Sequence, residues 1–337
     1  MVKSKFKSTI LYLIKILVAG LVAVAILSLM LFFVSITPIH LDNPKGNTDY
    51  VWLPDSIWVN TTEGISFGRV DSDGFNNEKV IVDPDILLVG SSHMEAKNVF
   101  YSQSVSGILS KDFEGIYSVY NVGISGHHFY KACQYLPDNL ELYKNSLKYI
   151  VVETSDVDLT LDKVEETLSH TVEKTPSYAV GLIAKLQKIP FIYGFYKQMD
   201  GGLLDILLDR QKPVSSTSVE DKTVDLVAFE KMFEYLQNIE KDGGVEIIIF
   251  YHPTEKFDEN GNIVFDSGES LKAFDNAAKK YGIDFIDMTL RFEKTYDEIH
   301  KLPHGFVTGE AGKGHLNPTG HKIIADEIYR FITEKDS

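Results

Sequence analysis

The sequence has little cysteine and comparatively little positive charge. Cys133 is the only cysteine among 337 residues, which excludes an intramolecular disulfide and a cysteine-based metal site. Lysine and arginine together number 33 against 48 acidic residues, so the formal net charge is −15. Because an acidic surface repels phosphate groups, we expect neither a nucleic-acid partner nor a polybasic face that docks on membranes.

One long run of the sequence carries no charge, from Ile16 to Ile39. As a helix it would span roughly 36 Å, enough to cross a hydrocarbon core of about 30 Å with some tilt. Four lysines precede it, at positions 3, 5, 7 and 15. The positive-inside rule predicts a single-pass transmembrane helix over residues 16–39, with residues 1–15 in the cytoplasm and the remainder extracytoplasmic. A cleaved signal peptide is the alternative, but its apolar run would be shorter.

The rest of the chain divides into two parts by pattern. Residues 40–80 are polar with scattered aromatics, and we interpret them as a juxtamembrane segment that packs on the edge of a domain. From residue 81 to 337, short apolar runs alternate with helical patterns. Such alternation predicts an α/β domain of three layers, with a flavodoxin-like parallel sheet of about five strands. Residues 158–222 break the alternation, and we interpret them as a helical insertion. The predicted strands are Asp85–Gly90, Tyr117–Val122, Tyr149–Glu153, Val245–Tyr251 and Asp284–Met288.

Candidate catalytic residues lie where these strands end, because sites in parallel sheets form at the carboxyl ends of the strands. The first strand runs into Gly90-Ser91-Ser92-His93, a turn that can expose the Ser92 hydroxyl. The second runs into a loop that contains Gly126, where a backbone N–H can approach an oxyanion without hindrance. His315 directly precedes the last helical pattern and can reach the same rim as a general base for a serine.

Together these three blocks resemble the SGNH, or GDSL-type, hydrolase family, over about residues 83–333. The resemblance implies that Ser92 is the nucleophile and that His315 is the base. It also implies an oxyanion hole formed by Ser92 and Gly126, with a third donor at Ser155. The sequence from His315 through Ala325 fits the His-Leu-Asn-x-x-Gly-His tail that often follows the base in this family.

Two positions depart from the family pattern. Ser155 stands where the family has an asparagine in the oxyanion hole, and Gly312 stands where an aspartate usually orients the histidine. A serine hydroxyl can still donate, although it is shorter than an asparagine amide. The missing carboxylate can come from elsewhere in the chain, and the candidates are Asp156, Asp158 and Glu310.

Several further histidines fall at or near predicted strand ends. We expect His93, His252 and His304, together with Asp156, to contact substrate or to support the catalytic pair. Imidazoles also bind Zn²⁺, so a metal site is a rival interpretation. No His-Glu-x-x-His motif or other paired ligand spacing supports it, and we expect no cofactor. The histidines that this rival would draw on are His93, His127, His252, His304 and His315.

The sequence therefore supports two hypotheses. The first is an extracytoplasmic serine esterase or O-acyltransferase, which acts on acyl groups of a cell-surface glycan, with acetyl as the expected group. The second is a catalytically decayed, glycan-binding partner of a membrane acyltransferase or of a polysaccharide export complex. The departures at Ser155 and Gly312 motivate the second hypothesis.

Overall fold

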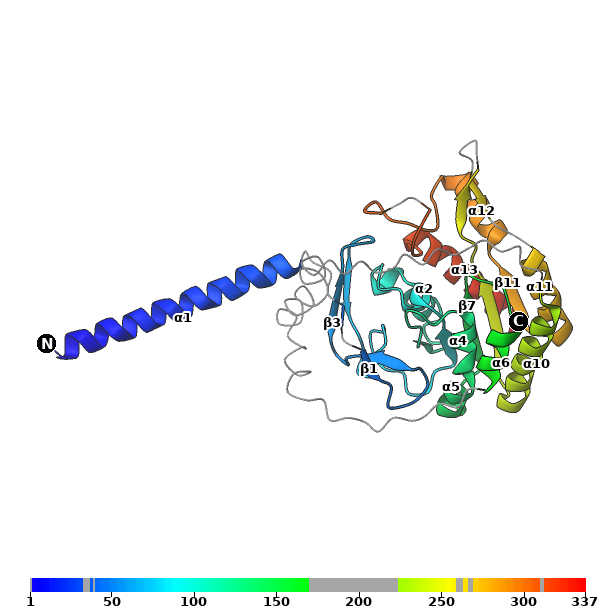
Figure 1. Ribbon diagram of the computed structural model, residues 1–337, viewed down its shortest axis with the longest axis horizontal. Coiled ribbons are helices and arrows are strands. Elements are labelled where there is room, and N and C mark those ends of the chain that lie inside the picture. The colour runs from blue at the N-terminus through cyan, green and yellow to red at the C-terminus, as the bar shows by residue number, and fades with distance from the viewer. Residues whose placement is uncertain are drawn as a thin grey trace.

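The computed structural model describes residues 2–32, 37–38, 40–169, 224–258, 263–265, 269–309 and 312–337. Its longest helix, α1 (Val2–Phe32), extends away from the other elements (Figure 1). Within the described ranges, no helix has both the length and the apolar character that a membrane crossing requires. The transmembrane helix predicted at residues 16–39 is not found in this part of the chain, and residues 33–36 and 39 of that segment lie outside it.

A parallel sheet forms the centre of the fold. Its strand order is β11-β8-β7-β5-β6, and each neighbouring pair is parallel. This is the flavodoxin-like order, with β5 as the first strand, so the predicted sheet is confirmed. The strands on both sides of the centre are short, apolar and mostly buried, as expected for a sheet that is covered on both faces. They are β5 (Ile86–Val89), β6 (Val119–Asn121), β7 (Tyr149–Thr154), β8 (Glu246–Tyr251) and β11 (Asp284–Asp287).

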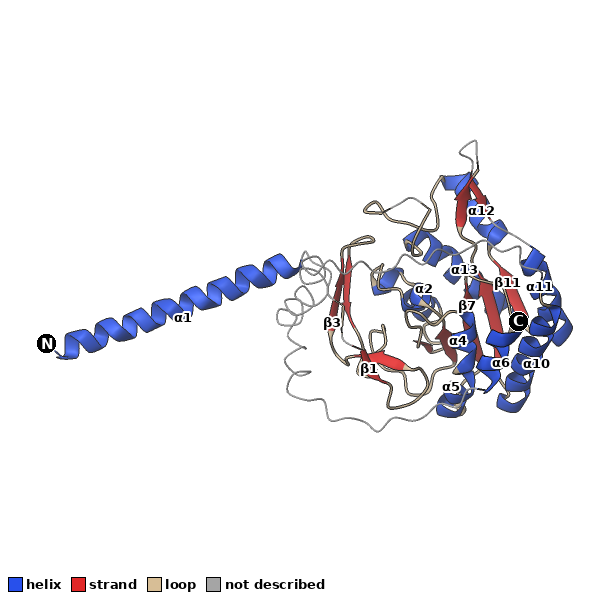
Figure 2. Cartoon of the chain, in the orientation of Figure 1, coloured by secondary structure: helices blue, strands red, loops and turns tan. Residues whose placement is uncertain are grey.

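Alternate residues of each strand face different helical layers (Figure 2). In β5, Leu87 and Val89 pack in one core, whereas Ile86 and Leu88 pack in the other. This follows from the two-residue period of a strand. The first core contains α4 (Phe129–Gln134), α5 (Leu136–Tyr143), α6 (Leu161–Ser169), α10 (Leu226–Gly243) and α11 (Glu269–Tyr281). The second contains α3 (Val105–Asp112), α12 (Thr289–Ile299) and α13 (Pro318–Lys335).

Some elements differ from the sequence pattern. The helix expected over residues 127–143 is two helices, because the chain turns at Tyr135 and Pro137 opens the second one. A short 3-10 helix, η1 (Tyr101–Gln103), precedes α3. An antiparallel pair, β9 (Glu255–Phe257) and β10 (Ile263–Phe265), was not expected from the pattern. Of the insertion expected at 158–222, the structure describes residues 158–169, which include α6, and the remainder lies outside the described residues.

The segment 40–80 forms two small antiparallel pairs. Strand β1 (His40–Asp42) pairs with β2 (Tyr50–Trp52), and β3 (Ile57–Asn60) pairs with β4 (Ser66–Arg69). The segment then packs on the edge strand β6, where the Asn77 side chain donates to the Asn121 carbonyl (2.9 Å) and accepts from its N–H (3.1 Å). The amide group of Asn77 thus occupies the hydrogen-bonding positions that a further strand would use.

Candidate active site

Ser92 lies at the carboxyl end of β5, on the first turn of the short helix α2 (Ser92–Glu95). Ser91 is the N-cap of this helix, and its hydroxyl accepts the His93 N–H at 3.3 Å. Such a serine cap fixes the start of a helix and satisfies one of its free N–H groups. The cap therefore turns the chain sharply after the strand and leaves the half-buried Ser92 side chain at the rim of the sheet.

Beneath this turn lies the Glu153 carboxylate, at the end of β7. Its Oε2 accepts the Ser91 N–H at 2.6 Å. A β-carbon at Gly90 would stand 2.7 Å from the same oxygen, so glycine is required for this close approach. Burial would raise the Glu153 pKa, but hydrogen bonds from His252 and Ser91 outweigh burial and lower it. A buried carboxylate thus holds the turn that carries Ser92.

His315 approaches Ser92 from the loop before α13, and its Nε2 lies 2.9 Å from Ser92 Oγ. The loop closes on itself, because Gly305 donates to the His315 carbonyl (3.0 Å) and Asn317 donates to the Pro303 carbonyl (2.9 Å). Asn317 is also the N-cap of α13 and accepts from two backbone N–H groups of its first turn. These contacts fix the His315 backbone immediately before the helix.

The second ring nitrogen of His315 contacts a carboxylate that the sequence analysis did not identify. His315 Nδ1 lies 2.5 Å from Glu63 Oε2, which also accepts the His315 N–H at 3.2 Å. Asn98 donates to the same oxygen at 3.2 Å. Both side chains are about one third exposed, at 32% for His315 and 33% for Glu63. Ser92, His315 and Glu63 therefore form the contact chain of a Ser-His-carboxylate triad.

Glu63 lies in the turn between β3 and β4, and the loop before α13 holds that turn in place. The Asn60 side chain accepts the Thr62 N–H and donates to the Glu63 carbonyl, which closes the turn. The Gly64 N–H donates to the Thr308 hydroxyl at 2.8 Å. The turn is therefore attached to the same loop region that carries His315.

The carboxylates proposed from sequence do not take this role. Asp156 is exposed, and its Oδ1 accepts the Asp158 N–H. The Asp158 carbonyl accepts the Tyr130 hydroxyl on the α4 side of the sheet. Glu310 lies outside the described residues. A glutamate in a polar turn gives no local signal of such a role, and 252 positions separate it from His315.

The remaining oxyanion candidates stay predictions. Gly126 is exposed in the loop after β6 with a φ of +87°, and Ser155 is half-buried just after β7. Both lie beyond strands that flank β5, as the strand-end rule requires. Among the hydrogen bonds of the described residues, none joins either one to Ser92 or His315. The Ser92 N–H, on the first turn of α2, is a third candidate donor by its position.

Three of the histidines expected near the site lie together. One ring nitrogen from each of His93, His252 and His304 lies within 4.8 Å of the other two. Burial, aided by the neighbouring imidazoles, lowers the pKa of His93 well below its ordinary value. Burial likewise lowers the His304 pKa. The His93 ring is also 5.3 Å from the His315 ring, centroid to centroid, so this cluster adjoins the Ser92–His315 pair.

His127 does not join this cluster. Its Nε2 lies 2.5 Å from the Asp49 carboxylate, and its ring stacks on Tyr135. It therefore connects the segment 40–80 to the start of α4.

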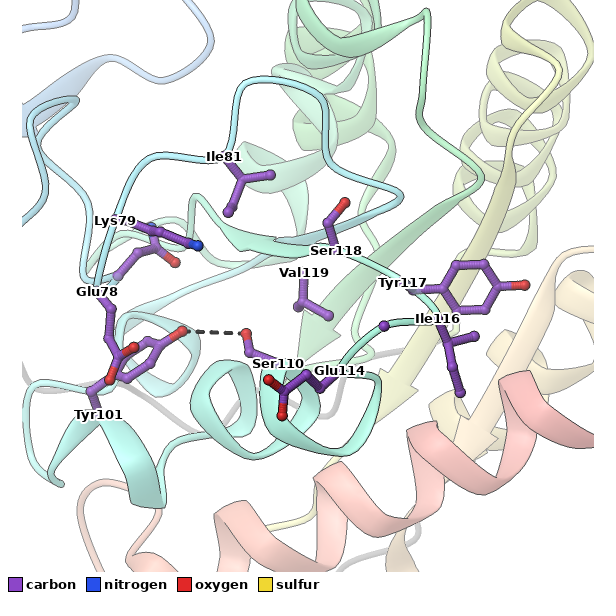
Figure 3. A pocket seen from close by; sticks show the side chains of 12 residues that line it. Glu78, Lys79, Ile81, Tyr101, Ser110, Glu114, Ile116, Tyr117, Ser118 and Val119 are labelled. Atoms are coloured by element: carbon purple, nitrogen blue, oxygen red, sulfur yellow. Dashed lines mark hydrogen bonds between the residues drawn. The ribbon is translucent and has the colours of Figure 1, made fainter.

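A pocket of about 350 Å³ lies beside the edge strand β6 (Figure 3). Tyr101 and Ser110 contribute to its wall and are joined by a hydrogen bond of 3.3 Å between their hydroxyls. Lys79 and Glu78 extend along its rim from the segment that covers β6. The lining includes neither Ser92 nor His315, so this pocket is separate from the candidate triad.

No protein-family model matches the chain, and no curated protein matches it by sequence. Solved structures do match in the course of the chain. The acetyl xylan esterase AlAXEase is 14% identical, with 73% of this chain and 98% of that one covered at a TM-score of 0.40. TesA is 13% identical, with 73% and 96% covered at a TM-score of 0.37. A catalytic mutant of Axe2, an acetylxylan esterase from Geobacillus stearothermophilus, is 12% identical, with 74% and 94% covered at 0.36.

Proposed function

We propose that this protein is a serine ester hydrolase or O-acyltransferase that forms an acyl-enzyme on Ser92. The observation that carries the proposal is the contact chain from Ser92 Oγ to His315 Nε2 (2.9 Å) and from His315 Nδ1 to Glu63 Oε2 (2.5 Å). A serine hydroxyl becomes an effective nucleophile when an adjacent base accepts its proton and a third group orients that base. All three groups meet here at the rim of the sheet.

In the proposed reaction, Ser92 Oγ attacks the acyl carbonyl carbon while its proton passes to His315 Nε2. The negative charge on the carbonyl oxygen is stabilised by backbone N–H donors, for which Ser92 and Gly126 are the candidates. The bond to the leaving alcohol then breaks, and His315 returns the proton to that alcohol. Water or a sugar hydroxyl attacks the acyl-enzyme in a second step, with its proton taken by His315. Glu63 stabilises the imidazolium in both steps.

We further propose that the substrate is an acetylated glycan at the outer face of a membrane, and that a membrane acyltransferase can act as partner. The support comes from the sequence, in which the charge-free run from Ile16 to Ile39 follows four lysines. A carbonate wash of membranes from cells that express the full chain tests this location, with the chain lacking residues 1–39 as control. Release of the full chain into the supernatant would overturn it.

The triad is tested by ester turnover and by covalent labelling of the purified protein. We expect a fluorophosphonate to label one residue, Ser92, and acetyl-ester turnover to be lost in Ser92→Ala and in His315→Ala. Because the two residues act as a unit, the double variant should be no slower than either single variant. Turnover at the wild-type rate by both single variants would refute the mechanism.

The glycan-binding alternative predicts a different outcome. A decayed domain would bind glycan but would not be labelled at Ser92. One motive for that alternative was the absence of an aspartate at position 312, and Glu63 now supplies a carboxylate to His315. We therefore favour the enzyme.

A further inference from the structure

Beside the proposed triad, two imidazoles face each other at a short distance. His252 follows β8, and His304 lies in the loop that leads to α13. His252 Nδ1 and His304 Nε2 are 3.3 Å apart, and both residues are buried, with exposures of 0% and 2%. In a tetrahedral zinc site with Zn–N bonds of 2.0–2.1 Å, neighbouring ligand nitrogens are separated by about 3.4 Å. The two nitrogens are thus spaced as adjacent corners of such a site.

Each of these rings contacts a buried carboxylate through its other nitrogen. His252 Nε2 lies 2.9 Å from Glu153 Oε1, and His304 Nδ1 lies 2.6 Å from Glu255 Oε2. A hydrogen on each of those outer nitrogens leaves a lone pair on each inner nitrogen. Two lone pairs 3.3 Å apart repel unless a proton or a cation lies between them. A carboxylate behind each ligating histidine is also the usual outer shell of a metal site.

The charge of the cluster favours a divalent cation over a single proton. Glu153 and Glu255 are buried, at 2% and 4% exposure. The partners described for them are imidazoles and backbone N–H groups, namely those of Ser91 and His304. Buried carboxylates are costly without compensating positive charge. A divalent cation between the rings would balance both negative charges and leave every imidazole neutral.

His93 supplies a third imidazole to the same space. One of its ring nitrogens lies within 4.8 Å of the ligand atoms of His252 and His304, and its ring centroid is 4.6 Å from that of His252. Its Nδ1 accepts the Leu316 N–H at 3.2 Å. A metal ion must therefore either replace that N–H at Nδ1 or displace the proton from Nε2. Because His93 is half-buried, it also gives the cluster a side open to solvent.

We propose that His93, His252 and His304 form a binding site for one divalent transition-metal ion of the Zn²⁺ class. Three neutral imidazoles with a fourth position open to water or substrate are a common zinc ligand set. Because His93 directly follows Ser92 and its ring lies 5.3 Å from that of His315, the ion would adjoin the proposed triad. This site does not depend on the proposed esterase activity, and its test measures binding.

The experiment uses the full chain without a histidine tag, stripped of metal with a chelator. Zn²⁺ is titrated by calorimetry, and Co²⁺ is titrated by its visible absorption, which reports tetrahedral coordination. We expect one equivalent of each ion to bind to the wild type and to Ser92→Ala. Glu255→Gln should bind Zn²⁺ about 10–100-fold more weakly, because it removes an outer partner of a ligand. His93→Gln should lose the tetrahedral cobalt spectrum.

His128→Gln is the matched control, since His128 is exposed at the start of α4 and remote from the cluster in contacts. It should bind both ions as the wild type does, and circular dichroism should show each variant folded. Failure of the folded wild type to bind an equivalent of Zn²⁺ would overturn the proposal in favour of a shared proton between the rings. Equal cobalt spectra in His93→Gln and the wild type would also overturn it. Loss of ester turnover in Ser92→Ala with metal binding retained would separate this site from the triad.

Discussion

Glu63 Oε2 lies 2.5 Å from His315 Nδ1, although the two residues are 252 positions apart and belong to different layers of the fold. One comes from the turn between β3 and β4, and the other comes from the loop before α13. The family pattern places an aspartate three residues before the histidine, where this chain has Gly312. The N-terminal segment therefore completes a triad that the C-terminal motif leaves without its acid.

Glu63→Gln should retain the position of the side chain but lose its negative charge. The imidazolium formed during the reaction would then be less stable, and the ring could adopt the wrong tautomer. We expect kcat for an acetyl ester to fall by about 10²–10⁴-fold with little change in KM. Steady-state kinetics of the purified chain give both constants.

Asp156→Asn is the matched control, because Asp156 is an exposed carboxylate proposed for the same role from sequence. Its kcat should stay near the wild-type value. The opposite ranking of the two variants would show that Glu63 is not the acid of the triad.

Gly314 allows Glu63 to approach His315. Its φ is +90°, and a β-carbon there would stand 2.9 Å from a Glu63 carboxylate oxygen. Gly314→Ala should therefore strain the backbone, by about 1–3 kcal/mol, and also displace the carboxylate. Gly282→Ala is the comparison, because Gly282 has a φ of +73° with no atom within 4 Å of the added carbon.

Urea unfolding and kinetics of the two glycine variants separate strain from displacement. Both variants should lose stability, but only Gly314→Ala should lose kcat. Equal kcat values in Gly314→Ala and the wild type would mean that Glu63 can move aside without consequence.

His321 predicts an acid-sensitive contribution to stability. Burial, aided by the nearby imidazoles, lowers its pKa to about 3. The unfolded chain takes up this proton near pH 6.5, so between about pH 6.5 and pH 3 the unfolded state binds more protons than the folded state. Stability should therefore decrease as pH falls through this window, by up to about 1.4 kcal/mol per pH unit.

Urea unfolding at pH 7 and at pH 5 measures this dependence. His321→Leu should lose less stability between the two pH values than the wild type does. His128→Gln removes an exposed histidine and should keep the wild-type dependence. A wild-type dependence in His321→Leu would show that other groups account for the acid sensitivity.

Asn77 closes the edge of the sheet at β6. Its side chain pairs with both backbone groups of Asn121, which is fully buried. Asn77→Ala would leave a buried N–H and a buried carbonyl without partners, at a cost of about 2–4 kcal/mol. Urea unfolding should show this loss, whereas the exposed Asn238→Ala should stay within about 0.5 kcal/mol of wild type. A similar small change for Asn77→Ala would mean that water replaces the lost contacts.

The sheet could be predicted because its signals are local. Apolar runs such as Ile86–Val89, each followed by a helical pattern, specify a buried parallel strand without reference to distant residues. Ser92 and His315 were also accessible to sequence analysis, since each stands at the boundary between an element and its loop. Their roles in chemistry remain predictions, as do those of Gly126 and Ser155.

Other features depend on contacts that no local pattern encodes. Glu63 is one of many carboxylates in polar turns, and its partner is fixed only when the turn between β3 and β4 meets the loop before α13. His252 and His304 are likewise brought to within 3.3 Å by the end of β8 and a loop 52 positions later.

By itself, the sequence determined the order of strands and helices, the acidic surface, the single cysteine, and the serine and histidine placed at the sheet rim. These follow from periodicity, charge and strand ends, all of which act over a few residues. Only the tertiary structure decided which carboxylate contacts His315 and which histidines gather beside it. The reason is physical, because those pairings depend on how loops pack across the rim of the sheet, and packing joins residues that the sequence separates.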